Sequence, residues 1–140
     1  MFLGRVLGLD VGDVRIGIAV SDLLMITAQG SETYIRKDDD ADMIYLCEFV
    51  KKNDVDRIVC GLPKNMNGSI GPQAQKTQVF GEMLSEATGI KVIYWDERLT
   101  TKSANRTLIE ADMSRKKRKK VVDKIAAVYI LQGFMDSLKY

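Results

Sequence analysis

The chain has 140 residues, enough for one domain with its own hydrophobic core. Hydrophobic residues make up 46% and charged residues 29% of it, a balance that is typical of globular proteins and excludes a disordered or fibrous one. No apolar run approaches the roughly 20 residues that a membrane-spanning helix needs. Cys47 and Cys60 lie in apolar segments without metal-ligand spacing, which predicts reduced structural cysteines in a cytoplasmic protein.

The sequence contains no histidine, and this excludes several kinds of active site. A Ser-His or Cys-His nucleophile system and a His-ligated zinc or iron site all need an imidazole. Any chemistry must therefore use carboxylates, hydroxyls, amines, backbone groups or a metal that is held by oxygen atoms.

The net charge of +2 hides a concentration of positive charge in one segment. Six of the 21 basic residues are consecutive: Arg115, Lys116, Lys117, Arg118, Lys119 and Lys120. Removing 6 from 21 leaves 15 basic residues against 19 acidic ones, so the rest of the chain is mildly acidic. Like charges repel, which predicts a solvated, flexible connector here. A nucleic-acid backbone would order such a segment on binding, so we interpret it as a phosphate-binding segment.

The first half of the chain predicts three strands and a helix. Residues 5–10 and 15–22 are rich in Val, Ile and Leu and flank a turn at 11–14, so we expect a hairpin. An extended stretch at about 26–35 completes a meander. Three aspartates after Lys37 then open a helix that runs to about residue 53, because the helix dipole favours acids at that end.

The second half alternates strands and helices. Its predicted elements are a strand at 56–61, a loop at 65–72, a helix to about 88 that Gly89 stops, a strand at 91–95, and helices at 101–113 and 121–138 with the basic run between them. This order predicts an α/β fold in a single domain over residues 1–140. We expect one mixed five-stranded sheet with an antiparallel N-terminal hairpin and helices on both faces.

Three carboxylates stand at the ends of predicted elements. Asp10 ends the first strand, Glu97 follows the strand at 91–95, and Asp123 lies in the first turn of the last helix. Each has an ordinary alternative role: a turn residue, a solvated side chain, or an acid at a helix start. Open α/β sheets keep their sites at the outgoing ends of parallel strands, so we expect the three to converge if the last helix packs beside the first strand.

Converging carboxylates need a cation. Two unit charges about 4 Å apart repel by about 4 kcal/mol at an effective dielectric constant of about 20. Oxygen ligands select Mg²⁺ or Mn²⁺. Two such ions about 4 Å apart can activate a water molecule and stabilise the leaving oxygen of a phosphodiester. Because the metal would supply the nucleophile, such a site needs no histidine base, which fits the composition of the chain.

Four motifs follow one another along the chain. They are GLDVG at 8–12 with RIG at 15–17 and AVSD at 19–22, GLP at 61–63 with NG at 67–68, DERLTT at 96–101, and VDKIAA at 122–127. Together they resemble the YqgF/RuvX proteins, a family of Holliday junction resolvases related to RuvC. The resemblance covers essentially the whole chain, with the motifs in the family's order.

This resemblance implies an RNase H-like fold and metal-dependent cleavage of nucleic acid, with Asp10, Glu97 and Asp123 as catalytic metal ligands. The better-studied resolvases have a fourth acidic residue close to the last of these, whereas Lys124, Ile125 and Ala126 follow Asp123 here. The family is also linked to maturation of ribosomal RNA precursors. The implied substrate is therefore Holliday junction-type DNA or the 5′ end of a ribosomal RNA precursor.

Further phosphate contacts are predicted outside the basic run. Lys64 and Asn67 follow the GLP motif, and Arg98 stands beside Glu97, where it could instead pair with a neighbouring acid. No aromatic residue interrupts the basic run, which favours recognition of the backbone or shape over base reading. A junction with two-fold symmetry would also suit a homodimer.

Two other functions are compatible with parts of this pattern. An ATPase of the actin/sugar-kinase kind also begins its phosphate hairpin with Asp-x-Gly, but that architecture needs two such domains, and the chain has no GxxxxGK[ST] loop. A non-catalytic nucleic-acid-binding or ribosome-assembly factor could keep the same fold with an acidic site that only binds an ion.

Overall fold

The computed structural model describes residues 4–24, 27–97 and 115–138, with the side chains of the last segment described from Lys124 onward. Its elements are β1 (Arg5–Val11), β2 (Arg15–Ser21), β3 (Ala28–Ile35), α1 (Asp39–Lys52), β4 (Val55–Leu62), α2 (Pro72–Thr88), β5 (Val92–Asp96) and α4 (Arg115–Ser137). None of the helices in these segments is both long enough and apolar enough to span a membrane.

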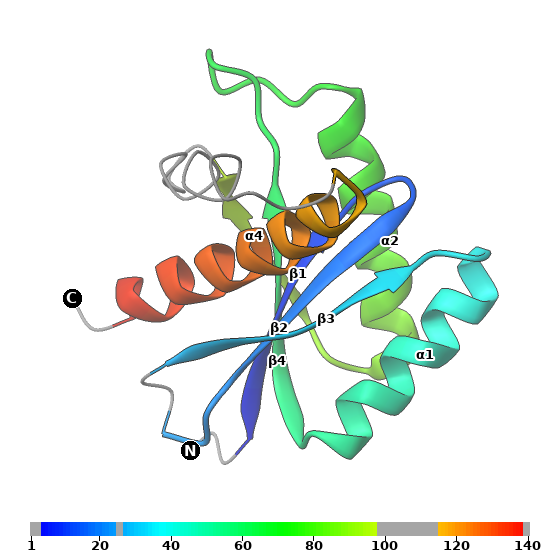
Figure 1. The fold of residues 1–140 in the computed structure, drawn as a ribbon, viewed down its shortest axis with the longest axis vertical. Coiled ribbons are helices and arrows are strands. Elements are labelled where there is room, and N and C mark those ends of the chain that lie inside the picture. Colours follow the sequence, from blue (N-terminus) through cyan, green and yellow to red (C-terminus); the bar gives the residue numbers. More distant parts are fainter. Residues whose placement is uncertain (1–3, 25–26, 98–114, 139–140) are drawn as a thin grey trace.

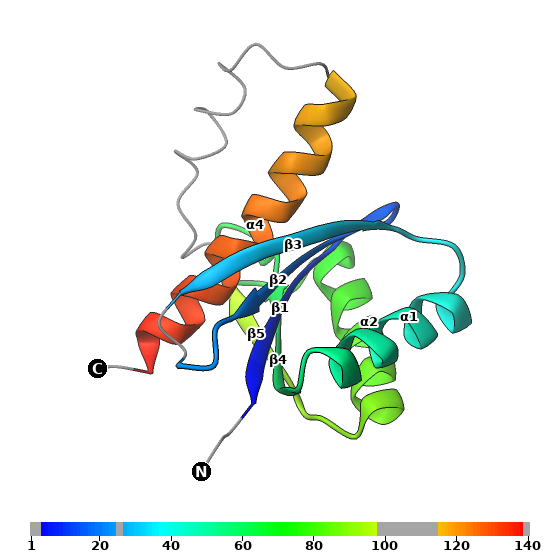
Figure 2. The same cartoon turned by 60° about the horizontal axis from the view of Figure 1, so that its bottom comes forward.

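The five strands form one mixed sheet in the order β3-β2-β1-β4-β5. β1, β2 and β3 pair antiparallel, and β1 pairs parallel with β4, which pairs parallel with β5. Helix α4 covers one face of the sheet, and α1 and α2 cover the other (Figures 1 and 2). The predicted α/β architecture, with its antiparallel N-terminal hairpin and helices on both faces, is confirmed.

Alternating residues of β1 pack into two separate hydrophobic cores, one on each face of the sheet. Leu7 and Leu9 are fully buried in the core beneath α1 and α2, whereas Val6 packs in the core beneath α4. Gly8 lets α4 approach closely, because a Cβ at this position would lie 2.7 Å from the Cβ of Leu131. Since successive side chains of a strand point to opposite faces, Asp10 shares the α4 face with Val6 and Gly8.

The ends of α1 and α2 follow from local chemistry. The side chain of Asp38 accepts a 2.8 Å hydrogen bond from the Ala41 amide and caps α1. Gly89 has φ 74° and its amide donates to the Ser85 carbonyl at 2.9 Å, which ends α2. The predicted stop at Gly89 is therefore confirmed, since glycine reaches this left-handed backbone conformation without steric cost.

The prediction for the basic run is wrong in one respect. Arg115–Lys120 is not a connector before the last helix but forms the first turns of α4, which begins at Arg115 rather than at 121. Lys and Arg are good helix formers, and Figure 2 shows these turns beyond the edge of the sheet. The predicted helix at 101–113 lies outside the described residues.

Candidate active site

Asp10 and Glu97 come together at one edge of the sheet although their strands are not neighbours. Asp10 lies near the outgoing end of β1, and Glu97 directly follows β5. β4 separates these two strands. The Glu97 carboxyl nevertheless forms a hydrogen bond with the Asp10 side chain. Two of the three predicted acids therefore share one site on the α4 face, at the edge where parallel strands end.

The pair has the electrostatics of two carboxylates that are too close to ionise together. Burial, the charge of Asp10, the hydrogen bond with Asp10 and the charge of Asp96 raise the pKa of Glu97 to about 8. Burial, with the charges of Asp10 and Glu97, also raises the pKa of the Cys60 thiol to about 12. Cys60 is fully buried and stays a thiol at neutral pH, so we assign it no chemistry.

The third predicted acid, Asp123, occupies a backbone position in α4 one turn before Ala127. Ala127 is fully buried against β1, and a Cβ at Gly8 would lie 3.2 Å from its carbonyl oxygen. The Asp123 side chain lies outside the described part. Among the described side chains, no three acids, cysteines or histidines gather into a metal site. The carboxylate oxygens of Asp10 and Glu97 are hard ligands that suit a divalent cation. A bound cation would also neutralise the repulsion between the two carboxylates.

The shared proton predicts how the stability of the metal-free protein depends on pH. The pKa of Glu97 is raised from 4.5 to about 8 in the folded state. Its stabilising contribution is therefore complete below about pH 4.5 and is lost as the pH rises through about 8. We expect the unfolding free energy to fall by up to about 1.4 kcal/mol per pH unit within this window.

Urea unfolding in EDTA at pH 5, 7 and 9 measures this loss. In Glu97→Gln the position no longer titrates, so its unfolding free energy should vary less over the same pH range than that of the wild type. Parallel pH profiles for the two proteins would contradict the shared proton.

Comparison with known proteins identifies the family. The family model for the RuvX Holliday junction resolvases matches residues 4–137. The chain belongs to this family. A "Putative pre-16S rRNA nuclease" of Clostridium acetobutylicum is 54% identical over 134 residues, which cover 96% of this chain and 99% of the relative. A protein of the same name from Clostridioides difficile is 54% identical over 136 residues, 97% of this chain and 96% of the relative.

Solved structures confirm that this RuvX family member has the RNase H-like fold. Thermus thermophilus RuvC in complex with a Holliday junction substrate matches with a TM-score of 0.58 and 11% identity, covering 97% of this chain and 96% of RuvC. Fowlpox virus resolvase with Holliday junction DNA matches with a TM-score of 0.60 and 10% identity, covering 97% and 99%.

The loop after β4 places the other predicted nucleic-acid contacts of this RuvX family member. Lys64 is half-buried and its amide donates to the Leu62 carbonyl at 3.0 Å, at the edge of the sheet where β4 ends. Asn67 is exposed, but its side-chain oxygen accepts hydrogen bonds from the amide and hydroxyl of Ser69 at 3.0 and 2.6 Å. Asn67 therefore shapes the loop. Arg98 lies outside the described residues.

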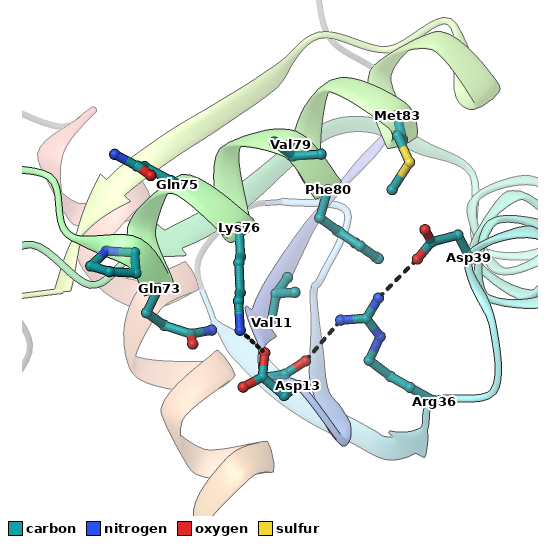
Figure 3. A pocket seen from close by; sticks show the side chains of 12 residues that line it. Val11, Asp13, Arg36, Asp39, Gln73, Gln75, Lys76, Val79, Phe80 and Met83 are labelled. Carbon is teal, nitrogen blue, oxygen red and sulfur yellow. Dashed lines mark hydrogen bonds and ion pairs between the residues drawn. The ribbon is translucent and has the colours of Figure 1, made fainter.

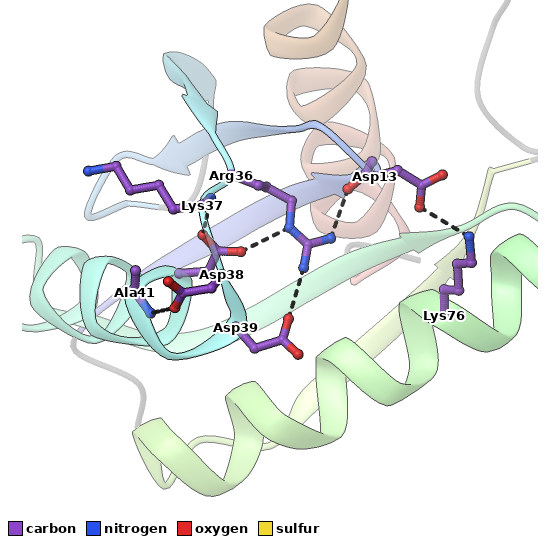
Figure 4. A network of polar contacts seen from close by, with 9 residues as sticks. Asp13, Arg36, Lys37, Asp38, Asp39, Ala41 and Lys76 are labelled. Atoms are coloured by element: carbon purple, nitrogen blue, oxygen red, sulfur yellow. Dashed lines mark hydrogen bonds and ion pairs between the residues drawn. The ribbon is translucent and has the colours of Figure 1, made fainter.

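A buried ion pair, which the motifs do not reveal, supports the hairpin that follows Asp10. Arg36 donates to Asp42 at 2.9 Å, to Asp39 at 3.3 Å and to the Gly12 carbonyl at 3.0 Å (Figure 4). Asp42 is fully buried and also accepts a 3.1 Å hydrogen bond from the Lys37 amide. Arg36 thus ties the β1–β2 turn to the start of α1. No periodicity in the sequence signals the burial of this pair, because it depends on the packing that buries Asp42 and brings the Gly12 carbonyl to Arg36.

A cavity of about 460 Å³ lies on the opposite face of the sheet from the acids. Val11, Phe80 and Met83 are among its apolar lining residues, and the exposed pair Lys76–Asp13 stands at its side, 3.4 Å apart (Figure 3). The Arg36 guanidinium lies 5.0 Å from the centre of the Phe80 ring. Because Asp10 faces α4, this cavity is separate from the carboxylate site.

Proposed function

We propose that this RuvX family member is a Mg²⁺- or Mn²⁺-dependent nuclease that hydrolyses phosphodiester bonds in structured nucleic acid. The observation that supports it most directly is the meeting of Asp10 and Glu97 across β4 at the outgoing edge of the sheet. Family membership and the nuclease names of relatives at 54% identity also support nuclease activity. They favour this function over an ATPase of the actin/sugar-kinase kind.

In this proposal Asp10, Glu97 and Asp123 hold the metal, and α4 brings Asp123 to the other two. When bound, the metal supplies an activated water molecule and stabilises the leaving oxygen. In its absence, the Glu97 carboxyl holds a proton in its hydrogen bond with Asp10, which keeps both groups at the site. Burial around Glu97 strengthens the attraction between the carboxylates and a cation, because fewer water molecules screen it.

We propose that the basic turns of α4 bind the nucleic-acid backbone, with Lys64, Asn67 and Arg98 as further contacts. Arg115–Lys120 begins α4, and the positive end of the helix dipole disfavours cations there. Backbone phosphates would compensate both the dipole and the mutual repulsion of the six side chains. The run ends shortly before Asp123, so the bound backbone would lead toward the acids.

The basic turns predict a strong salt dependence of nucleic-acid binding. With up to six phosphate contacts, the logarithm of the association constant should fall with the logarithm of salt concentration at a slope of up to about −5. Fluorescence anisotropy in EDTA between about 50 and 300 mM KCl measures this slope, because the Debye length shortens over this range.

Changing four lysines to glutamine should flatten the slope by about 3 to 4 units. The variant carries the substitutions Lys116→Gln, Lys117→Gln, Lys119→Gln and Lys120→Gln. Its control is Lys51→Gln with Lys52→Gln, two exposed lysines at the end of α1, on the other face of the sheet. The control removes two charges, so a loss of slope about half that of the four-lysine variant would show that net charge, and not α4, sets the affinity.

Among structured nucleic acids, we propose a precursor of 16S ribosomal RNA as the working substrate, because the relatives with 54% identity bear that name. The solved structures with Holliday junctions are only 10–11% identical to this chain, so they support the fold and not the substrate. We propose the cytoplasm as the place of action, since Cys47 and Cys60 are free and thiols stay reduced there. We further propose that residues 1–140 act as one domain and that a two-fold junction substrate would favour a homodimer.

A cleavage assay with matched substrates tests the proposal. The protein is incubated with a precursor rRNA transcript, a four-way DNA junction and a linear duplex, each with Mn²⁺, Mg²⁺ or EDTA. Metal-dependent cleavage of the transcript is expected, and faster cleavage of the junction would reassign the substrate. Tight binding without cleavage of any substrate would favour the non-catalytic assembly factor.

A further inference from the structure

Gly61 lies in β4 between the strands that hold the two acids. Leu9 of β1 pairs with Cys60 of β4, and Gly61 pairs with Trp95 of β5. Continuing the first register places Asp10 beside Gly61. Neighbouring strands are about 4.8 Å apart, so β1 and β5 are separated by about 10 Å. A carboxyl group that starts from the end of β5 can meet Asp10 only by passing over β4.

Glu97 passes over β4 through the space that a side chain at position 61 would fill. A Cβ at Gly61 would overlap Glu97 Oε1 and Ile130 Cδ1, and it would lie 2.9 Å from Glu97 Cγ. The backbone itself does not call for glycine here, because the positive φ angles among the described glycines are those of Gly68 and Gly89. Glycine is needed at position 61 because it has no side chain to fill this space.

We propose that Gly61 is a positioning residue, whose missing side chain leaves the passage through which the Glu97 carboxyl reaches Asp10. Ile130 of α4, which is 2% exposed, forms the opposite wall of this passage. This inference rests on the proposed function, because that function requires Asp10 and Glu97 to bind a metal ion together. It adds a residue that touches neither the metal nor the substrate.

Gly61→Ala tests this with little risk to the fold. The atoms within 3 Å of the new methyl group, Glu97 Oε1 and Cγ and Ile130 Cδ1, all belong to side chains and none to the backbone. We therefore expect a melting temperature close to that of the wild type and a displaced Glu97 carboxyl. Mn²⁺ affinity, measured by calorimetry, should fall by about 10- to 100-fold. Cleavage should fall by about 100-fold, as expected for a misplacement of about 1 Å.

A second substitution separates positioning from packing. Ile130→Val removes Cδ1, one of the two atoms that the methyl group would overlap, but leaves the overlap with Glu97. The Gly61→Ala, Ile130→Val double variant should therefore keep the weak Mn²⁺ affinity. The matched control is Gly81→Ala in α2, where the new methyl group would overlap the Tyr94 hydroxyl in the other core. This control should bind Mn²⁺ and cleave like the wild type.

Two results would overturn the role of Gly61. One is wild-type Mn²⁺ affinity in Gly61→Ala, and the other is recovery of that affinity in the double variant, which would assign the loss to packing. Failure of the proposed function looks different. A wild type that binds Mn²⁺ but cleaves no substrate would sink the nuclease proposal and leave the affinity comparison valid. If the wild type binds no Mn²⁺, the metal site is refuted, and so is the role of Gly61 in forming it.

Discussion

Asp10→Asn abolishes cleavage of every substrate while the protein remains folded: this is the largest effect on activity that we expect. The substitution keeps the size of the side chain but removes one of the two carboxyl groups that meet across β4. Even groups outside the ligand shell typically change metal affinity or activity by 10- to 100-fold. The loss of a ligand should therefore lower the cleavage rate by more than about 100-fold.

A nearby aspartate provides the matched control. Asp13 lies in the turn after β1, and its side chain is 60% exposed and pairs with Lys76 at 3.4 Å. Asp13→Asn removes the same charge three residues away and should leave cleavage unchanged. The rates of both variants are compared at saturating Mn²⁺, with circular dichroism as the test of folding. Wild-type cleavage by Asp10→Asn would refute the assignment of the metal ligands.

The largest effect on stability is expected from Arg36→Ala. Arg36 is the cation beside Asp42, a carboxylate whose side chain is only 1% exposed. Removing one partner of a buried ion pair leaves the other charge without compensation, which costs about 3–5 kcal/mol. The loss of the Gly12 contact would also release the turn that follows β1. Urea unfolding at pH 7 measures the loss of unfolding free energy.

Two comparisons isolate the buried charge. Lys76→Ala breaks the exposed pair with Asp13 and should cost less than about 1 kcal/mol. Adding Asp42→Asn to Arg36→Ala neutralises the stranded carboxylate and should restore part of the stability. Equal costs for Arg36→Ala and Lys76→Ala would show that burial does not govern the energy of the Arg36 pair.

The pair also sets a limit on acid stability. Burial by itself raises the pKa of Asp42, but hydrogen bonds from the Lys37 amide, Arg36 and Tyr34 outweigh it, and the pKa lies below its usual value. A lowered folded-state pKa stabilises the protein above the ordinary value near 3.8, and this contribution is lost as the pH falls through the folded-state pKa. Its sign is opposite to that of Glu97, whose contribution is lost as the pH rises.

Local patterns in the sequence determined much of the architecture. The Val- and Ile-rich segments on either side of the turn at 11–14 predicted the β1–β2 hairpin, and Gly89 predicted the end of α2. These signals act between residues that are close in the chain, where side-chain period and backbone sterics dominate. The ordered motifs likewise predicted the family, which the family model confirms over residues 4–137.

The candidate site is assembled by tertiary contacts that the sequence does not reveal. The sequence predicted that Asp10 and Glu97 converge, but not that a strand lies between them or that Gly61 leaves the space for their contact. The pairing of Arg36 with Asp42 was equally unpredicted. Both depend on which strands are neighbours and on what the helices bury, and these contacts join residues far apart in the chain or on different elements. No sequence pattern shows that Gly61 is needed for the space that it leaves. That role is evident only when the pairing of β1, β4 and β5 is known.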